Sequence, residues 1–277
     1  DTLESARLGD HRVQRLAGAL ELMRELAPSL VLQASLRGDH SSSWGNRMTP
    51  GAGLSWTATP RLKLRAAWGK AFRAPSFTEL YYVSPAQKGD PGLRPERSQS
   101  LEAGADWCGT GGATLSATVF RRRDLDQIDW VRRDPKDPWT AANLGTVRAE
   151  GLSLQGACRP APRLSASFGW SWTHLEIPQA DYASRYAPDC VRHHVTGTLS
   201  AELARETRLG LTCTYKDRAL PGPDPLLLSL RLSRRFKSLE AFLQGENLLD
   251  RRWEELQGIP LPGRTFSAGL RWRQEGR

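Results

Sequence analysis

Apolar and polar residues alternate along most of this chain, and a period of two is typical of β-strands. The clearest example is the segment 226–233, LLLSLRLS, in which leucine occupies every even position. Other segments with one apolar face begin at Leu30, Ala52, Leu62, Leu101, Leu164, Val191 and Phe266. The segment 16–26 could also form a short helix by propensity, although we predict a strand. The pattern predicts about thirteen strands of about nine to twelve residues, the length that a tilted strand needs to cross a bilayer.

The connections between the predicted strands alternate in length. Short connections fall at 25–28, 58–60, 109–112, 160–162, 205–207 and 236–238. Long connections fall between them, at 38–48, 69–97, 132–145, 174–189, 216–224 and 247–264. Outer-membrane barrels have tight turns on the periplasmic side and long loops outside, whereas a soluble β-sandwich has no reason to separate its loops by length. The sequence therefore predicts an all-β fold, an antiparallel transmembrane β-barrel of the outer-membrane type.

Tryptophans recur near the ends of the predicted strands. Those near short connections are Trp56, Trp107 and Trp272, and those near long connections are Trp68, Trp130, Trp170 and Trp172. Membrane barrels carry an aromatic girdle at each interface, so we predict that these seven residues form two girdles. The alternative is that they are ordinary core residues. The alternation is broken around 120–128 and 147–152, where we expect β-bulges.

The composition is compatible with a membrane barrel. The 277 residues carry a net charge of +9, and the mean hydropathy is −0.50. No run approaches the roughly eighteen apolar residues of a membrane-spanning helix, but a barrel strand shows only every second residue to lipid, so average hydropathy does not detect it. Lys and Arg lie mostly at alternate strand positions and in loops, so we expect no nucleic-acid partner.

The residue types that support catalysis or metal binding are scattered. The four cysteines form no CxxC pair and have no Cys/His ligand spacing, so we expect no metal site, and their disulfide pairing stays open. His193 and His194 are adjacent in a predicted strand and face opposite ways. No nucleophile motif accompanies either of them. We therefore expect no enzyme activity, no catalytic residue and no cofactor.

The longest predicted loop, Ala71–Ser100, carries two motifs in a fixed order. WGKAFRAPSFTE at 68–79 and GDPGLRPERSQSLEAG at 89–104 resemble the barrel signature of TonB-dependent outer-membrane receptors, with Asp90 where Asn is common. The signature residues here are Phe72, Arg73, Ala74, Pro75, Ser76, Pro91, Leu93, Pro95 and Glu96. The prolines restrict the backbone of the loop. We expect Glu96 to pair with an arginine such as Arg73 or Arg97.

The resemblance extends towards the end of the chain. NLG at 143–145, followed by AEG at 149–151, is similar to a strand entry of the family, although Ser153 stands where Glu is usual. GENLLDRRWEE at 245–255 and LPGRTFSAGLRWR at 261–273 are similar to its last loop and final strand. The signature residues of these segments are Asn143, Gly145, Gly151, Asn247, Asp250, Pro262, Gly263 and Arg264.

Members of this family have an N-terminal plug domain and a barrel of about 22 strands. This chain shows no plug motif, so we expect residues 1–277 to be the C-terminal portion of such a barrel, a fragment without its plug. It begins at Asp1 without a signal-peptide pattern, which indicates that a signal peptide was removed or that the chain is a fragment.

The resemblance implies a receptor in the bacterial outer membrane that takes up a scarce nutrient. The ligand would be a ferric siderophore or a corrinoid such as cobalamin, and the energy-coupling protein TonB would act through the missing plug. Membrane lipid and lipopolysaccharide are further expected partners, and we expect a monomer. Ligand contacts are predicted for aromatic and cationic residues of the outer loops: Tyr81, Tyr82, Trp139, Tyr182, Arg185, Tyr186, Arg218, Arg251 and Trp253.

Other interpretations remain open from the sequence. The loop arginines could instead bind lipopolysaccharide phosphates, and the loop aromatics could pack within the loops. The chain could also be a passive, porin-like or non-transporting barrel. A soluble β-sandwich that binds a ligand is a third interpretation, and it predicts that the protein is folded in water without detergent.

Overall fold

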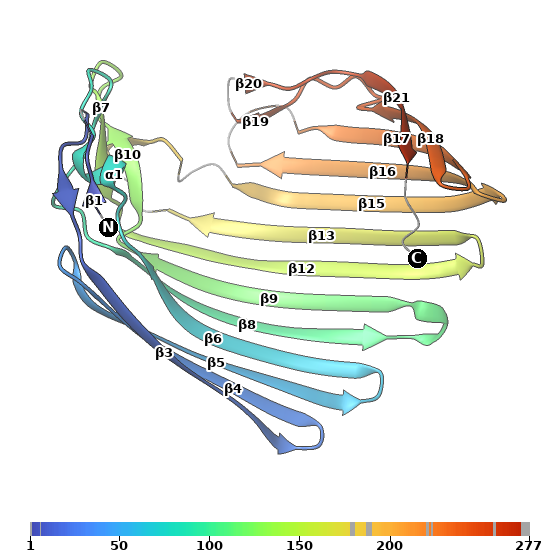
Figure 1. The fold of residues 1–277 in the computed structure, drawn as a ribbon, viewed down its shortest axis with the longest axis horizontal. Coiled ribbons are helices and arrows are strands. Elements are labelled where there is room, and N and C mark those ends of the chain that lie inside the picture. Colours follow the sequence, from blue (N-terminus) through green and yellow to red (C-terminus); the bar gives the residue numbers. More distant parts are fainter. Residues whose placement is uncertain are drawn as a thin grey trace. The chain divides into compact units, whose positions relative to one another are not determined.

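A computed structural model describes residues 2–5, 7–177, 181–186, 190–219, 222, 224–256 and 259–272. Among these residues, thirteen strands form one antiparallel sheet in the order β21-β18-β17-β16-β15-β13-β12-β9-β8-β6-β5-β4-β3 (Figure 1). The order follows the chain because each strand pairs with the next long strand through a hairpin or a loop. The all-β fold and the predicted number of strands are therefore confirmed.

The chain divides into two compact units. The first comprises Asp1–Ala105, Thr118–Gly151 and His174–Asp189, and the second comprises Asp106–Ala117, Leu152–Thr173 and Cys190–Arg277. Long strands of the first unit alone are β3 (Arg15–Ala27), β4 (Leu30–Ser41), β5 (Gly45–Thr59) and β6 (Leu62–Arg73). Strands with residues in both units are β8 (Glu96–Cys108), β9 (Thr114–Leu125), β12 (Thr146–Ala161) and β13 (Leu164–Glu176). Long strands of the second unit alone are β15 (Val191–Ala204), β16 (Thr207–Arg218), β17 (Leu226–Phe236), β18 (Leu239–Glu246) and β21 (Thr265–Trp272).

Short elements occupy the connections. The first unit contains the pair β1 (Thr2–Leu3) and β2 (His11–Arg12), the helix α1 (Phe77–Tyr81), and a small sheet of β7 (Gln87–Lys88), β10 (Ile128–Arg132), β11 (Trp139–Asn143) and β14 (Ala183–Ser184). The second unit contains a 3-10 turn (Thr110–Gly112) and the pair β19 (Glu254–Leu256) and β20 (Ile259–Pro260). No helix in the described part of the chain is long and apolar enough to span a membrane.

The apolar face of the long strands is exposed rather than packed. In β17 and β18, Leu232 is opposite Leu243, and these side chains are 39% and 60% exposed. Leu20 and Leu270, on β3 and β21, are 76% and 72% exposed. A soluble sandwich would bury these faces against a second sheet. An apolar face of this extent requires a lipid environment.

Three predictions about element boundaries were tested. The segment 16–26 is part of β3, so the strand prediction is confirmed. The predicted loop Ala71–Ser100 was too long, because β6 continues to Arg73 and β8 begins at Glu96. The loop between them contains the helix α1, which was not among the predicted elements. The break at 120–128 coincides with the end of β9 at Leu125, followed by Asp126 at φ 58°.

The aromatic girdle prediction was wrong for Trp130. This residue lies in β10 of the small sheet, and its side chain is 9% exposed within a buried cluster. It therefore cannot face lipid, since the strand pattern around it belongs to a folded loop. Trp56, Trp107 and Trp272 are 46%, 43% and 66% exposed on strands of the large sheet. The girdles themselves stay a prediction.

Candidate functional site

The loop that follows β6 is shaped by a capping box at the start of α1. The Ser76 hydroxyl accepts a hydrogen bond from the Glu79 amide at 3.2 Å, and the Glu79 carboxylate accepts one from the Ser76 amide at 2.7 Å. This reciprocal pair satisfies two amides that have no partner within the helix. The sequence Ser-Phe-Thr-Glu at 76–79 is thus a local signal from which this helix could have been predicted.

Arg73 joins α1 to the start of β8. Its guanidinium binds Glu96 through two hydrogen bonds of 2.7 Å and binds Glu79 through two of 3.0 Å. Glu96 also accepts a hydrogen bond from the Ile128 amide at 2.7 Å, which ties β10 to the same point. The expected pairing of Glu96 with an arginine is confirmed, and that arginine is Arg73. We call the group Arg73, Glu79, Glu96 and Ile128 the loop clasp.

The loop clasp sets the charge of Glu79. Partial burial of this side chain would by itself raise its pKa, but the hydrogen bonds from Arg73 and Ser76 outweigh burial and lower the pKa of Glu79 below its ordinary value. The carboxylate is therefore ionised at neutral pH. Its charge holds Arg73 in place.

A second hydrogen-bond network joins the signature residue Asn143 to the same loops. The Asn143 side-chain amide donates to the carbonyl oxygens of Arg94 and Asp126, at 3.0 and 2.7 Å, and its oxygen accepts from the Arg94 amide at 2.9 Å. The Asp126 carboxylate accepts a hydrogen bond of 2.7 Å from each of Arg94 and Arg97. Arg97 therefore pairs with Asp126, and not with Glu96.

The same loops also contain a small apolar core. Its buried members are Leu80, Leu93, Ile128, Trp130 and Ala141, with Tyr81 and Trp139 packed against it. The loop after β6 passes so close to α1 that a Cβ atom on Gly89 would lie 2.8 Å from the Glu79 carbonyl oxygen. Only glycine fits at this position without a backbone shift. This core makes the loops of the first unit a folded structure of their own.

Aromatic and cationic side chains gather on Trp139 at the edge of this core. The guanidinium carbon of Arg132 lies 4.3 Å from the Trp139 ring centroid, and that of Arg185 lies 5.7 Å from it. Arg185 also lies 5.4 Å from the Tyr186 ring. We call Arg132, Trp139, Arg185 and Tyr186 the arginine–tryptophan cluster. The prediction had placed three of these residues in the ligand site, and the structure brings those three together; Arg132 was missed.

Asp129 holds the segment that carries Arg185 and Tyr186. Its side chain is 3% exposed and accepts hydrogen bonds from the Ser184 hydroxyl and from the Tyr186 amide, the latter at 3.0 Å. A buried carboxylate is costly unless such partners compensate for the lost water. Asp129 therefore positions the cluster without taking part in its surface. It was missed because nothing in the sequence distinguishes it from a surface aspartate.

Other predicted ligand residues of the first unit have different surroundings. Tyr81 stacks on His11, with ring centroids 3.6 Å apart. The Tyr82 backbone ends α1, and its carbonyl accepts a hydrogen bond from the Gly89 amide at 2.7 Å. Tyr182 is half-buried just before β14. Tyr81 thus serves the packing of the loop, as the alternative interpretation expected.

Two of the predicted residues of the second unit, Arg218 and Trp253, lie beside the Lys216–Glu255 pair. Lys216 binds Glu255 at 2.9 Å and lies 6.0 Å from the Trp253 ring centroid. Arg218 lies 3.9 Å from the same carboxylate. Trp253 donates to the Pro262 carbonyl at 3.3 Å. Arg251 is exposed, and its backbone is held through its amide and carbonyl by the Asn247 side chain, at 3.0 and 2.8 Å.

The remaining signature residues have mainly structural contacts. Phe72 packs on Trp44 with ring centroids 5.0 Å apart. Asp250 accepts a hydrogen bond from the Arg264 amide at 2.9 Å, and a Cβ atom on Gly263 would lie 2.7 Å from its carboxylate. Pro95 and Gly151 are buried, whereas Pro91 and Gly145 are exposed. Ala74, Pro75 and Pro262 lie in the loops outside the strands.

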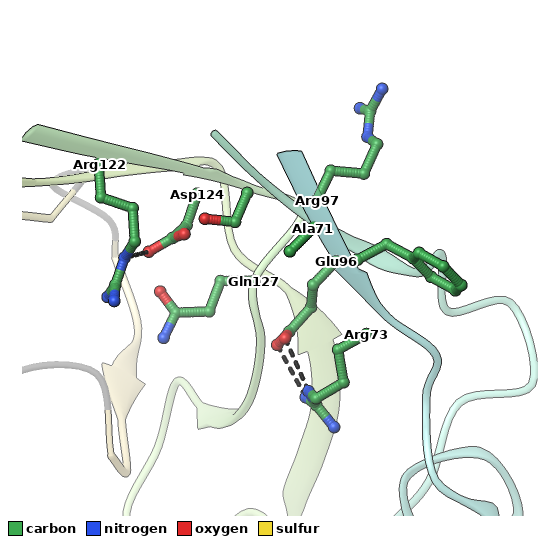
Figure 2. A pocket seen from close by; sticks show the side chains of 9 residues that line it. Ala71, Arg73, Glu96, Arg97, Arg122, Asp124 and Gln127 are labelled. Carbon is green, nitrogen blue, oxygen red and sulfur yellow. Dashed lines mark hydrogen bonds and ion pairs between the residues drawn. The ribbon is translucent and has the colours of Figure 1, made fainter. Parts of the chain in front are cut away.

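A polar pocket of about 310 Å³ opens beside the loop clasp (Figure 2). In Figure 2 the Arg73–Glu96 pair lies on one side, the Arg122–Asp124 pair on the other, and Gln127 between them. The Arg122 Nε atom donates to Asp124 at 2.9 Å. Arg122, Asp124 and Gln127 were not predicted, because sequence gave no reason to bring the end of β9 to the signature loop.

From the sequence, no metal site was expected and the pairing of the cysteines was left open. Among the described residues, no three His, Cys, Asp or Glu side chains are grouped so as to hold a metal ion. None of the described cysteines forms a disulfide.

A thirteen-stranded antiparallel sheet with an exposed apolar face and folded loops defines the strand-built class of outer-membrane proteins. Comparison with known families agrees. Residues 5–276 match the family described as "TonB dependent receptor-like, beta-barrel". The chain belongs to this family, and it is a protein of the bacterial outer membrane.

Individual relatives carry different ligands in their names. The chain is 31% identical over 126 residues to the vitamin B12 transporter BtuB of Vibrio vulnificus, covering 46% of this chain and 20% of that protein. It is 26% identical over 274 residues to the heme/hemopexin utilization protein C of Haemophilus influenzae, covering 81% of this chain and 38% of that protein.

Solved structures share the fold. The siderophore receptor PirA of Pseudomonas aeruginosa superposes with a TM-score of 0.80 at 20% identity, over 98% of this chain and 49% of that one. A mutant of the ferric enterobactin receptor PfeA of Pseudomonas aeruginosa in complex with enterobactin gives a TM-score of 0.76 at 21% identity, over 94% and 45%. The chain spans less than half the length of these proteins.

Proposed function

We propose that the chain is the C-terminal part of the barrel of a receptor that takes up a scarce nutrient across the outer membrane. The remaining strands and a plug domain would lie outside this sequence, and TonB would act through that plug. The share of the relatives' length that the chain covers supports this division. Members of the family are transport receptors, which supports a receptor in preference to an enzyme.

The arginine–tryptophan cluster is the observation that supports a ligand class. Arg132 and Arg185 present two guanidinium groups around one indole ring, on the outer loops of the first unit. Planar cations beside an aromatic face suit an anionic chelate with ring systems of its own. A ferric siderophore with anionic aromatic groups has both properties, so we propose it as the ligand.

A corrinoid is the second candidate. It is favoured by the similarity to a vitamin B12 transporter, at 31% identity over 126 residues. A corrinoid offers a broad ring face and a single phosphodiester, so it should depend more on Trp139 than on two arginines. The two ligands can therefore be separated with the same variants.

The test is uptake and binding by the protein expressed from its complete gene, in a strain without other receptors for the same ligands. Arg185→Gln removes one charge-assisted contact and should weaken binding of an anionic ferric siderophore about tenfold. Arg133→Gln is a matched control, because this neighbouring exposed arginine is outside the cluster and pairs with Asp181 at 3.7 Å. Equal effects of the two variants would contradict the proposed ligand site.

The same strain separates the receptor from a passive barrel. Uptake by the proposed receptor should stop when TonB is deleted, whereas diffusion through a passive barrel should continue. Saturable uptake of labelled cobalamin, with no binding of any ferric siderophore, would assign the second candidate.

A further inference from the structure

The exposed face of the last strands contains a groove of about 520 Å³ that the proposed uptake function does not use. Its lining residues come from β17, β18 and β21, which are neighbouring strands of the second unit (Figure 1). Two cross-strand rows form it: Arg234, Ala241 and Leu270 in one, and Leu232, Leu243 and Ala268 in the next. The hollow arises because alanine stands beside leucine in each row, so short side chains lie between long ones.

Arg234 is the one cation of this groove. It is exposed on β17, with its guanidinium carbon 5.0 Å from the ring centroid of Phe236. Its cross-strand neighbours are Thr207 and Ala241, neither of which carries a charge. Within the described part of the chain, Arg234 makes no ion pair. It is therefore a cation on an apolar face to which no carboxylate of the described residues is bound.

Two arginines on the opposite face of the same strands share one carboxylate. Arg231 and Arg271 lie 3.4 and 3.9 Å from the Glu240 carboxylate, and Arg231 also donates to Gln244 at 2.8 Å. Arg231 alternates with the exposed leucines of β17, so it points away from the lipid face. Arg231 thus has polar partners on its own face, whereas the residues that line the groove around Arg234 include no carboxylate.

The position of Arg234 along β17 places it at a membrane interface. It lies three residues before Lys237 in the short turn between β17 and β18. Short turns of outer-membrane barrels face the periplasm, and a charge on the lipid face is tolerated near an interface but not at the bilayer centre. Further cations lie in the other short turns of the second unit. Arg205, beside Glu206, is in the turn between β15 and β16, and Arg163 is in the turn between β12 and β13.

We propose that this groove binds one glycerophospholipid with an anionic headgroup from the inner leaflet of the outer membrane. The phosphodiester would bind the Arg234 guanidinium, and an acyl chain would lie along Leu232, Leu243 and Leu270. The guanidinium supplies the paired donors that suit a phosphate, and Phe236 restricts its orientation. A free phosphate would leave the apolar groove unexplained, and a lipid without a phosphate would leave Arg234 without an anion. The zwitterionic phosphatidylethanolamine also has a phosphodiester, but its ammonium group competes with Arg234 for it, whereas an anionic headgroup brings no competing cation.

The experiment measures lipid retained by the protein expressed from its complete gene. The protein is placed in nanodiscs of phosphatidylethanolamine with phosphatidylglycerol, released in the gas phase, and analysed by native mass spectrometry. Arg234→Gln should reduce the bound phosphatidylglycerol about fivefold, the effect of one arginine near an anionic surface. Arg234→Lys, which keeps the positive charge, should retain much of the bound phosphatidylglycerol. Ala241→Leu, which fills the groove and keeps the charge, should also reduce it.

Arg235→Gln is the matched control, because it removes the same charge from the next residue of β17, on the other face. The proposal is overturned if Arg235→Gln reduces retention as much as Arg234→Gln does, or if neither variant changes it. It is also overturned if lipid A added to the nanodiscs displaces phosphatidylglycerol through Arg234, since that would place the groove in the outer leaflet. Retention that depends on Arg234 and on an open groove supports it.

Discussion

Removing the charge of Glu96 should loosen the outer loops of the first unit without unfolding the sheet. The Glu96 side chain is 20% exposed, and its partner Arg73 is 47% exposed. In Glu96→Gln one of the two short hydrogen bonds to Arg73 is lost, because the amide nitrogen cannot accept, and the other loses its charge assistance. The Ile128 amide also faces a weaker acceptor. A hydrogen bond to a charged group contributes about 1.5–3 kcal/mol. Because Arg73 is half-exposed, solvent screening reduces the expected loss to about 1–2 kcal/mol.

Amide hydrogen exchange measures this loss locally. A loss of about 1–2 kcal/mol should speed exchange at the Ile128 amide about 5- to 30-fold, because the loop opens more often. Amides in the middle of β5 and β6 should exchange as before, since their ladder does not involve Glu96. Arg37→Gln is the control, because Arg37 binds Asp39 with equally short contacts of 2.7 and 2.8 Å outside these loops.

A double-mutant cycle with Arg73→Met shows whether the two groups act together. Arg73→Met should speed exchange at Ile128 less in the Glu96→Gln background than in the wild type, because the pair is already broken there. Unchanged protection at Ile128 in Glu96→Gln, or an equal change in Arg37→Gln, would refute the assignment of Glu96 as the residue that ties β10 to β8.

Three further predictions concern the same loops. The lowered pKa of Glu79 means that its carboxylate stabilises the loop at pH values above its unfolded pKa of about 4.3, and that this stabilisation is lost as the pH falls through the lower folded pKa. Amide exchange of the loop should therefore be faster in Glu79→Gln than in the wild type at neutral pH and equal to it at about pH 2. A difference in exchange that does not change with pH would contradict this. Gly89→Ala should increase proteolysis of the loop by placing a Cβ 2.8 Å from backbone, whereas Gly38→Ala, with nothing within 4 Å, should not. Asn143→Ala removes three hydrogen bonds and should destabilise the 126–145 hairpin by about 1–3 kcal/mol, measured by exchange at the Arg94 amide; unchanged exchange excludes this role of Asn143.

The strands were predictable because their signal is local. In β17 every second residue from Leu226 to Leu232 is leucine, and a strand with that pattern has the same two faces in any pairing. The alternation of short and long connections then indicated the membrane barrel. The signature residues Arg73, Ser76 and Glu96 were also recognised, and the choice between Arg73 and Arg97 as the partner of Glu96 was correctly left open.

The outer loops were less predictable because their contacts join distant segments. Trp130 follows a strand-like pattern, yet its ring is buried in a cluster with Leu80 and Leu93 from another loop. No periodicity reports such a contact, so the prediction of a lipid-facing Trp130 was wrong. Arg132 was missed as a neighbour of Trp139 for the same reason, since the hairpin of β10 and β11 brings them together.

The amino-acid sequence alone established the strand pattern, the membrane class and the family of this protein, because each depends on residues close together in the chain. Only the tertiary structure decided which charges meet. Arg231 and Arg234 are three residues apart in one strand, but Arg231 pairs with Glu240, whereas Arg234 lines an apolar groove. The partner of a charge is set by the neighbouring strands and by the face on which it lies, and both are fixed only when the sheet is formed.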